Sequence, residues 1–312
     1  MPDLARRSVR VDVPASTANL GAGFDVLALA LDISNEVEVE AVDGRPGWVD
    51  LSVEGAGAGQ LGRRNRFVQA LAAGLDAAGA GGVGVGWRIR MRNGIPLSRG
   101  LGSSAAATVA GLVAADALLG GGRLDTEAIL EIAARMEGHP DNAAAALLGG
   151  FVVVATVDGR PHAVRFDPPP RLSAVIFIPE RPLSTAAMRA ALPATVPFDD
   201  AVHNVGASSL AVAAMASGQL WLLRAATEDR LHEQYRAMAY RELPRLTDAA
   251  REAGALGACL SGAGSTVIAF VDDERMARDV EDAFRRAAEA AGLPGDTRTV
   301  RPRGTGARVL GE

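Results

Sequence analysis

The chain has 312 residues, of which 48% are hydrophobic and 22% are charged, and a formal net charge of −5, which suits one large or two ordinary globular domains. The negative charge argues against a nucleic-acid partner, no apolar run approaches the ~18 residues of a membrane span, and the N-terminus lacks the apolar core of a secretory signal. The single cysteine, Cys259, excludes an internal disulfide, so we expect a cytoplasmic protein.

All 32 basic residues are arginines. The absence of lysine excludes the Walker-type phosphate loop and the strand lysine of protein kinases, since both need that side chain. It also excludes Schiff-base chemistry with pyridoxal phosphate and any lysine nucleophile.

The hydrophobic pattern of the first half predicts strands and helices in irregular order. Apolar runs and apolar/polar alternation predict strands over 9–16, 24–42, 50–54, 85–92 and 151–157. Helical spacing predicts helices over 66–78, 103–119, 125–137 and 141–148, with Asp125 as an N-cap.

The second half follows a proline-rich linker at residues 167–170. Strands are expected over 174–178, 257–260 and 266–271 and near the C-terminus, with helices over 184–192, 199–216, 231–238, 242–253 and 273–291. Because helices and strands do not alternate regularly, the sequence predicts an α+β fold and not a doubly wound parallel sheet. We expect an N-terminal domain over 1–167 and a C-terminal domain over 168–312.

The clearest chemical signal is the segment IPLSRGLGSSAAA at residues 95–107, where a strand leads through a Gly/Ser loop into a helix. Gly100 and Gly102 let backbone amides approach a ligand closely, and Ser103 and Ser104 add hydroxyl groups. The free N–H groups and the dipole of a helix N-terminus attract an anion. The segment therefore predicts a phosphate-binding loop that needs no lysine.

Two acids and an amide lie in the run EGHPDN at residues 137–142. Glu137, Asp141 and Asn142 are suited to hold Mg²⁺ and a polar substrate, although in isolation the acids would be a solvated helix end and an N-cap. His139 has no neighbouring His or Cys, so we do not expect it to ligate a metal.

Two further segments are PASTANLGAGFD at 14–25 and LSGAGSTV at 260–267, the second of which alone would be a tight hairpin. Together the four motifs resemble the GHMP small-molecule kinases, named for galactokinase, homoserine kinase, mevalonate kinase and phosphomevalonate kinase. The segments 14–25 and 137–142, with STAAMR at 184–189, are similar to the homoserine-phosphorylating branch. The resemblance implies the GHMP kinase fold, an N-terminal domain like domain 2 of ribosomal protein S5 and a ferredoxin-like C-terminal domain.

The resemblance also implies ATP-dependent phosphorylation of the L-homoserine hydroxyl to O-phospho-L-homoserine, in threonine biosynthesis, by a homodimer. Ser104 and Glu137 would bind Mg²⁺, and Gly262 and Gly264 would let the C-terminal loop close over the substrate. The residues implied to contact ATP are Asn65, Pro96, Leu97, Ser98, Arg99, Gly100, Leu101, Gly102, Ser103, Ser104, Ala105 and Ala106. Those implied to bind homoserine are Asn19, Asp25, Asp141, Arg189, Arg236 and Gly262, with the two arginines at its carboxylate.

Thr185, Asn142 and Arg189 are implied to lie beside the reacting groups. Phosphoryl transfer needs positioning and charge neutralisation more than covalent help. In some relatives of this family, such as mevalonate kinase, the resemblance implies a mechanism in which an Asp/Lys pair assists the attacking hydroxyl. Here Asn142 stands at the matching Asp position and the lysine is missing. Because an amide cannot serve as a base, we expect the hydroxyl proton to pass to phosphate or water.

Two alternatives stay open. One is a kinase of the same fold that acts on another alcohol, such as mevalonate or a sugar, and the other is a non-catalytic nucleotide-binding module. The missing lysine and Asn142 argue against mevalonate, while Glu137 close to Asp141 argues against binding alone.

Overall fold

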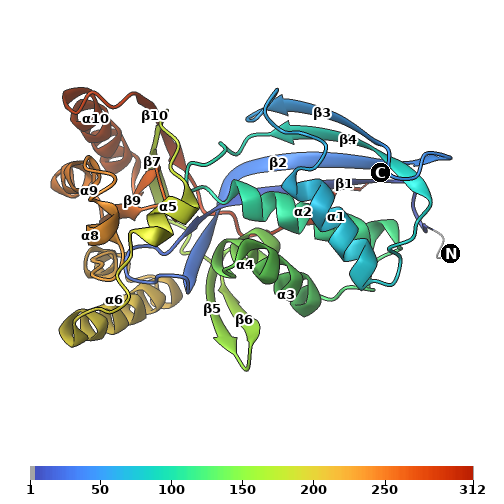
Figure 1. Cartoon of the computed structure of the whole chain (residues 1–312). Coiled ribbons are helices and arrows are strands. Elements are labelled where there is room, and N and C mark those ends of the chain that lie inside the picture. The colour runs from blue at the N-terminus through green and yellow to red at the C-terminus, as the bar shows by residue number, and fades with distance from the viewer. Residues whose placement is uncertain (1–3, 312) are drawn as a thin grey trace.

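Two largely antiparallel sheets, with helices packed on them, organise the chain (Figure 1). The computed structural model describes residues 4–311. Within that range the first sheet has seven strands in the order β11-β1-β2-β4-β3, with β5 on β2 and β6 on β5. These strands are β1 (Ser8–Ala18), β2 (Leu27–Asp43), β3 (Val49–Gly55), β4 (Val85–Asn93), β5 (Phe151–Val157), β6 (Arg160–Phe166) and β11 (Arg308–Val309).

Four helices cover one face of this sheet: α1 (Arg66–Ala77), α2 (Ser103–Leu118), α3 (Thr126–Glu137) and α4 (Asp141–Leu148) (Figure 1). Most side chains of α2 are buried, which explains its alanine-rich composition, because small residues let neighbouring elements approach. A Cβ on Gly111 would lie 2.5 Å from the carbonyl oxygen of Phe67 in α1. As predicted, Asp125 caps α3 by accepting a hydrogen bond from Ala128 N at 2.8 Å.

The second sheet has the order β10-β7-β9-β8, the strand order of a ferredoxin-like fold. Its strands are β7 (Ser173–Pro179), β8 (Gly257–Leu260), β9 (Val267–Val271) and β10 (Gly295–Val300), on which α9 (Leu243–Glu252) and α10 (Glu274–Ala290) pack. Between β7 and α9 the chain forms α5 (Thr185–Ala190), α6 (Phe198–Ser217), the 3₁₀ turn η1 (Leu220–Leu222), α7 (Leu223–Ala226) and α8 (Glu233–Arg236). No helix in residues 4–311 is long and apolar enough to cross a membrane.

After β10 the chain returns to the first sheet. Pro302 bridges to Leu31, and β11 pairs with β1. Arg303 and Arg308 approach the carboxylate of Asp12 at 2.5 and 3.2 Å. Residues 301–310 thus pack on the first sheet although they follow the second sheet in the chain, and the division into 1–167 and 168–312 stays a prediction.

Most predicted elements lie within a few residues of their predicted bounds, and the short elements β6, η1 and α7 were not predicted. The segment 24–42 forms one continuous strand that begins at Leu27. The strand β6 was not expected, because it is an outer strand whose side chains are largely exposed and carry little apolar alternation. The helix predicted over 231–238 is a single turn, α8.

Candidate active site

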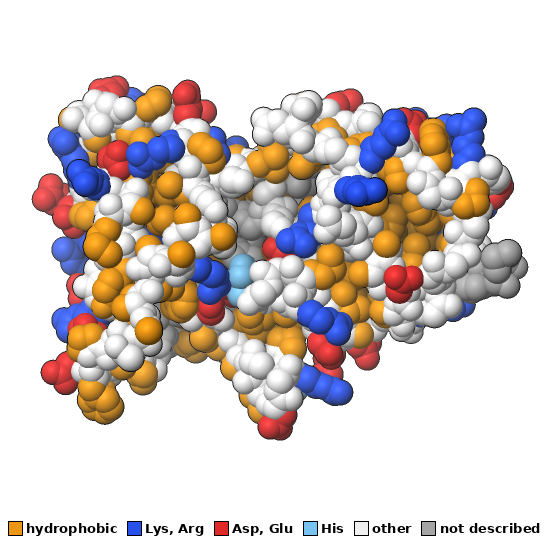
Figure 2. Space-filling view, in the orientation of Figure 1, with side chains coloured by type: hydrophobic (Ala, Val, Ile, Leu, Met, Phe, Trp, Pro, Cys, Tyr) orange, Lys and Arg blue, Asp and Glu red, His pale blue; other side chains and the backbone are white. Residues whose placement is uncertain are grey.

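A cavity of about 160 Å³ opens in the cleft between the two halves, where the surface in Figure 2 is hollowed. It is lined by the turn after β1, the N-terminus of α2, the α3–α4 turn, helices α5 and α8 and the β8–β9 loop. Basic, acidic and histidine side chains gather at its edge (Figure 2).

The Gly/Ser loop brings the N-terminus of α2 into this cavity. Gly102 is the N-cap, with φ of 68°, and no side chain caps the helix. Gly100 has φ of 74°, and a Cβ there would lie 2.1 Å from the carbonyl oxygen of Ser261, while a Cβ on Gly102 would lie 2.1 Å from Ser16 Oγ. Both positions therefore require glycine. The uncapped N–H groups and the helix dipole together form an anion site.

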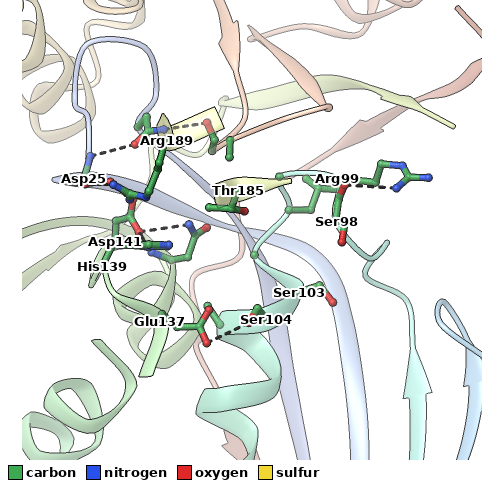
Figure 3. Close-up of a pocket in the computed structure, with 18 of the residues that line it drawn as sticks. Asp25, Ser98, Arg99, Ser103, Ser104, Glu137, His139, Asp141, Thr185 and Arg189 are labelled. Carbon is green, nitrogen blue, oxygen red and sulfur yellow. Dashed lines mark hydrogen bonds and ion pairs between the residues drawn. The ribbon is translucent and has the colours of Figure 1, made fainter. Parts of the chain in front are cut away.

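Glu137 lies beside this helix end (Figure 3). Its Oε1 accepts hydrogen bonds from Ser104 Oγ at 3.1 Å and Thr108 Oγ1 at 2.7 Å, and its side chain is 6% exposed. The Nε of Arg66 lies 3.3 Å from the same oxygen and 3.4 Å from Ser104 Oγ. The Glu137 carboxylate and the Ser104 hydroxyl therefore form a spot that attracts positive charge. Within residues 4–311 no group of three or more His, Cys, Asp and Glu side chains could hold a metal by itself.

The other end of the cavity carries paired charges (Figure 3). Arg189 of α5 donates to both carboxylate oxygens of Asp25, at 2.9 and 2.6 Å. Asp141 Oδ1 lies 2.7 Å from His139 Nδ1 and accepts from Asn142 N at 2.6 Å. Burial lowers the pKa of His139, but the hydrogen bond and charge of Asp141 outweigh it and raise that pKa. The charged imidazolium is thereby favoured next to a carboxylate.

Arg236 of α8 also lines the cavity, although only 1% of its surface is exposed. Its Nη1 donates to Gly262 O at 3.0 Å, an oxygen that also accepts from Asn19 Nδ2 at 3.0 Å. The guanidinium groups of Arg236 and Arg189 lie 5.3 and 5.5 Å from the ring centroid of Phe24. Burial, and then the charge of Arg189, lower the pKa of Arg236. One aromatic ring thus supports both arginines by cation–π contact.

The backbone around the cavity adopts uncommon conformations. Asn19, Asp25 and Ser98 have positive φ angles of 71°, 57° and 54°, a region that residues with side chains enter infrequently and that is found disproportionately at functional sites. Arg99 links the Gly/Ser loop to the second sheet, because its guanidinium donates to the carbonyl oxygens of Pro179, at 2.7 Å, and Glu180.

Most residues predicted from the sequence line this cavity: Asn19, Asp25, Ser98, Arg99, Gly100, Leu101, Gly102, Ser103, Ser104, Ala105, Glu137, Asp141, Asn142, Thr185, Arg189, Arg236 and Gly262. Asn65 is the N-cap of α1 and, with Leu97, lines an adjoining cavity. Ala106 is buried and its N–H donates to Gly102 O at 2.8 Å. Since Pro96 has no N–H, neither Pro96 nor Ala106 offers a free backbone donor.

The sequence did not point to His139 or Arg66 as site residues. His139 stands two residues before Asp141 in a tight turn, and this spacing was the available signal. Arg66 gave no signal, because local spacing does not say which part of α1 meets the end of α2.

Known proteins are similar to this chain in both sequence and structure. The GHMP kinases N terminal domain matches residues 65–150, and the GHMP kinases C terminal domain matches residues 211–290. The homoserine kinase of Caldicellulosiruptor bescii is 42% identical over 85% of each chain, and that of Streptomyces coelicolor is 42% identical over 87% of each. The crystal structure of homoserine kinase from Cytophaga hutchinsonii superposes with a TM-score of 0.87 at 29% identity and covers 98% of both chains. The chain therefore belongs to the homoserine kinases, within the GHMP kinase family.

Proposed function

We propose that this protein transfers the γ-phosphoryl group of ATP to the side-chain hydroxyl of L-homoserine, giving O-phospho-L-homoserine for threonine biosynthesis. The observation that carries this proposal is one cavity with an anion-binding helix N-terminus at one end and both acids and arginines at the other. An amino-acid acceptor carries an ammonium and a carboxylate on one carbon, so its site needs both signs of charge. Relatives named homoserine kinase, at 42% identity, support the same acceptor.

The phosphates of ATP would bind at the N-terminus of α2, and the base would occupy the adjoining cavity of about 240 Å³. The two cavities share Ser98, Ser103 and Ser104, so a nucleotide would reach from one to the other. The second cavity combines apolar and amide side chains, among them Leu61, Met91, Asn65 and Asn93. Such walls suit a flat base with polar edges.

Mg²⁺ fits Ser104 and Glu137, because a hydroxyl and a carboxylate are the hard oxygen donors that it prefers. The approach of the Arg66 guanidinium to both groups supports a cation there. Mg²⁺ is commonly held by one or two carboxylates together with substrate phosphates, which agrees with the small protein donor set. When bound, the ion neutralises charge on the phosphates.

The acceptor would bind between the acids and the arginines. Among residues 4–311 no group forms a hydrogen bond with Nη2 of Arg236, so one edge of this guanidinium is available to a carboxylate, which matches its planar fork. Asp25 and Asp141 supply negative charge for the ammonium. Thr185, at the first position of α5 on the cavity wall, would lie beside the transferred phosphoryl group.

No side chain in this arrangement is suited to be a dedicated base. Asn142 stands at the matching position, and its Oδ1 accepts from Ser16 Oγ at 2.8 Å. An amide does not take up a proton near neutral pH. The carboxylate of Asp141 already forms hydrogen bonds with Asn142 N and with the ring of His139. We therefore assign these residues to orientation, and the hydroxyl proton to phosphate or water.

The test compares L-homoserine with 3-aminopropan-1-ol, which is homoserine without its carboxylate, and with mevalonate and galactose. ADP release gives kcat/KM, and ³¹P NMR identifies the product. Loss of a charged partner at a buried site costs about 2–5 kcal/mol, so we expect homoserine to be preferred over 3-aminopropan-1-ol by roughly 30-fold or more.

Equal use of the two amino alcohols within about threefold would contradict carboxylate recognition. A preference for mevalonate or galactose would support a kinase for another alcohol, and ATP binding without turnover of any acceptor would support a binding module. In Arg189→Ala the preference for homoserine should fall. If it stays unchanged, Arg236 alone recognises the carboxylate.

A further inference from the structure

His232 lies directly behind the cavity, immediately before α8, and is completely buried. Its Nε2 lies 2.9 Å from Gly21 O, and its Nδ1 lies 3.1 Å from Nη1 of Arg236. The ring also packs on Phe24, with centroids 5.1 Å apart. His232 thus connects the loop that carries Asp25 to the arginine at the acceptor end.

The two hydrogen bonds determine the protonation of this ring. An arginine nitrogen only donates, so Nδ1 of His232 must carry a lone pair and accept from Arg236. The proton of the neutral ring is then on Nε2, where it donates to Gly21 O. A second proton on Nδ1 would face the guanidinium directly.

The charged surroundings agree with a neutral ring. Asp229 Oδ1 lies 3.7 Å from Nε2 and Arg236 lies on the Nδ1 side, and Asp25 adds a weaker negative charge. Burial lowers the pKa of His232 to about 4, against the opposing effect of Asp229. In the described part of the chain His232 is also absent from the cavity wall. Proton transfer to a substrate is therefore not its role.

We propose that His232 is a positioning residue that orients Arg236, so that the free Nη2 edge of this guanidinium faces the carboxylate of the acceptor. The other hydrogen bonds of Arg236 among the described residues go to backbone carbonyls, Gly262 O at 3.0 Å and Met188 O at 3.4 Å, and its guanidinium lies 5.3 Å from the ring centroid of Phe24. Within residues 4–311 His232 is thus the one side chain that is hydrogen-bonded to the guanidinium, and this directional contact sets its rotation. This inference rests on the proposed recognition of homoserine.

The test uses two substitutions, one of which keeps the acceptor for Arg236 while the other keeps the donor for Gly21 O. In His232→Asn the amide oxygen can occupy the position of Nδ1 and still accept from Arg236. In His232→Gln the amide reaches the position of Nε2 and keeps a donor for Gly21 O, but Arg236 loses its acceptor. The matched control is His203→Gln in α6, whose ring lies 3.1 Å from a backbone carbonyl oxygen, that of Glu228, and does not line the cavity.

For each variant, kcat/KM is measured for L-homoserine and for 3-aminopropan-1-ol, together with Tm. We expect the ratio of the two to fall roughly tenfold in His232→Gln, the scale for a hydrogen bond to a charged group, through a higher KM for homoserine. The ratio should fall less than threefold in His232→Asn and should not change in His203→Gln.

An unchanged ratio in His232→Gln, or equal falls in the Asn and Gln variants, would overturn the proposal, since a merely structural role affects both substrates alike. If the variants do not fold, ¹⁵N NMR of the wild-type protein tests the proposal, because it shows which ring nitrogen of His232 carries the proton. A proton on Nδ1 would also overturn the proposal. A wild-type ratio near one would instead contradict the proposed function.

Discussion

Ser104 lies in the first turn of α2, and its hydroxyl group donates to Glu137. Because Gly102 and not Ser104 is the N-cap, replacement by alanine removes no cap. We expect Ser104→Ala to keep its Tm within a few degrees and to lose about 10- to 100-fold in kcat, a scale found for groups around catalytic metals. Steady-state kinetics and thermal unfolding check this, with Ser209→Ala on the exposed side of α6 as control. Near wild-type kcat would contradict the phosphate site.

Glu137→Gln removes a charge and keeps the size of the side chain. The amide oxygen can still accept from Thr108, so the fold should persist. Because Mg²⁺ prefers charged oxygen donors, we expect the half-saturating Mg²⁺ concentration to rise several-fold while the KM for homoserine changes little. Titration of Mg²⁺ at fixed ATP measures the first quantity, and titration of homoserine at saturating Mg²⁺ and ATP measures the second, with Glu127→Gln in the first turn of the same helix as control. The reverse pattern would assign Glu137 to the acceptor.

Sequence motifs predicted the residues of this site better than the pairs they form. The resemblance to the GHMP kinases implied that Ser104 and Glu137 act together, and the structure joins their side chains at 3.1 Å. The pairing of Arg189 with Asp25, at 2.6 Å, was not predictable. It joins residues 164 positions apart, and only the packing of the two sheets brings them together.

Among the elements, β2 and β4 show why strand register could be inferred only in part. Glu36, Glu38 and Glu40 alternate along β2, and this predicts a strand with one wet face. Their partners follow from the antiparallel register, in which Glu38 lies opposite Arg90. The resulting ion pairs have N–O distances of 2.8 to 3.5 Å on the exposed face. The alternation predicts the wet face but not which strand supplies the arginines.

Reversal of one charge in this ladder tests the register. Glu38→Arg places a like charge opposite Arg90, and cross-strand pairs of this kind contribute about 0.2–1 kcal/mol. We expect Tm to fall by roughly 2 °C, and to fall less in high salt because exposed charges are screened. The double variant Glu38→Arg/Arg90→Glu should recover the loss. No recovery would mean that these two residues do not pair.

At the scale of the whole molecule, the second half contains a carboxyl group turned inward. Glu233 is half-buried as a residue, and its Oε1 accepts from Leu260 N at 2.6 Å. Burial of the carboxyl group, and then the charge of Asp229, raise the pKa of Glu233 to about 8. The folded protein therefore holds this proton at pH values where the unfolded chain has lost it.

A raised pKa in the folded state gives stability that is complete below the unfolded value, near 4.5, and declines as pH rises toward about 8. Glu233→Gln imitates the protonated acid and does not titrate. We expect the Tm of the variant minus that of the wild type to increase steadily between pH 5 and pH 8. Thermal unfolding across this range measures the difference, with the exposed Glu228→Gln as control. A constant difference would indicate that Glu233 is ionised throughout.

The return of residues 301–310 to the first sheet was another part of the architecture that the sequence did not indicate. The proline-rich segment 167–170 predicted a linker between two halves, but a short strand such as β11 carries little hydrophobic pattern. The two residues of β11 pair with β1 almost 300 positions away. Such a contact depends on tertiary structure and not on local preference.

This return also sets an order for biosynthesis. A ribosome makes β1 first, but its partner β11 and the arginines that neutralise Asp12 emerge only after every element of the second sheet. The edge of β1 stays open during that time, and a nascent chain stalled before residue 301 should expose it to proteases. The first half of this kinase is thus begun at the start of translation and closed near its end.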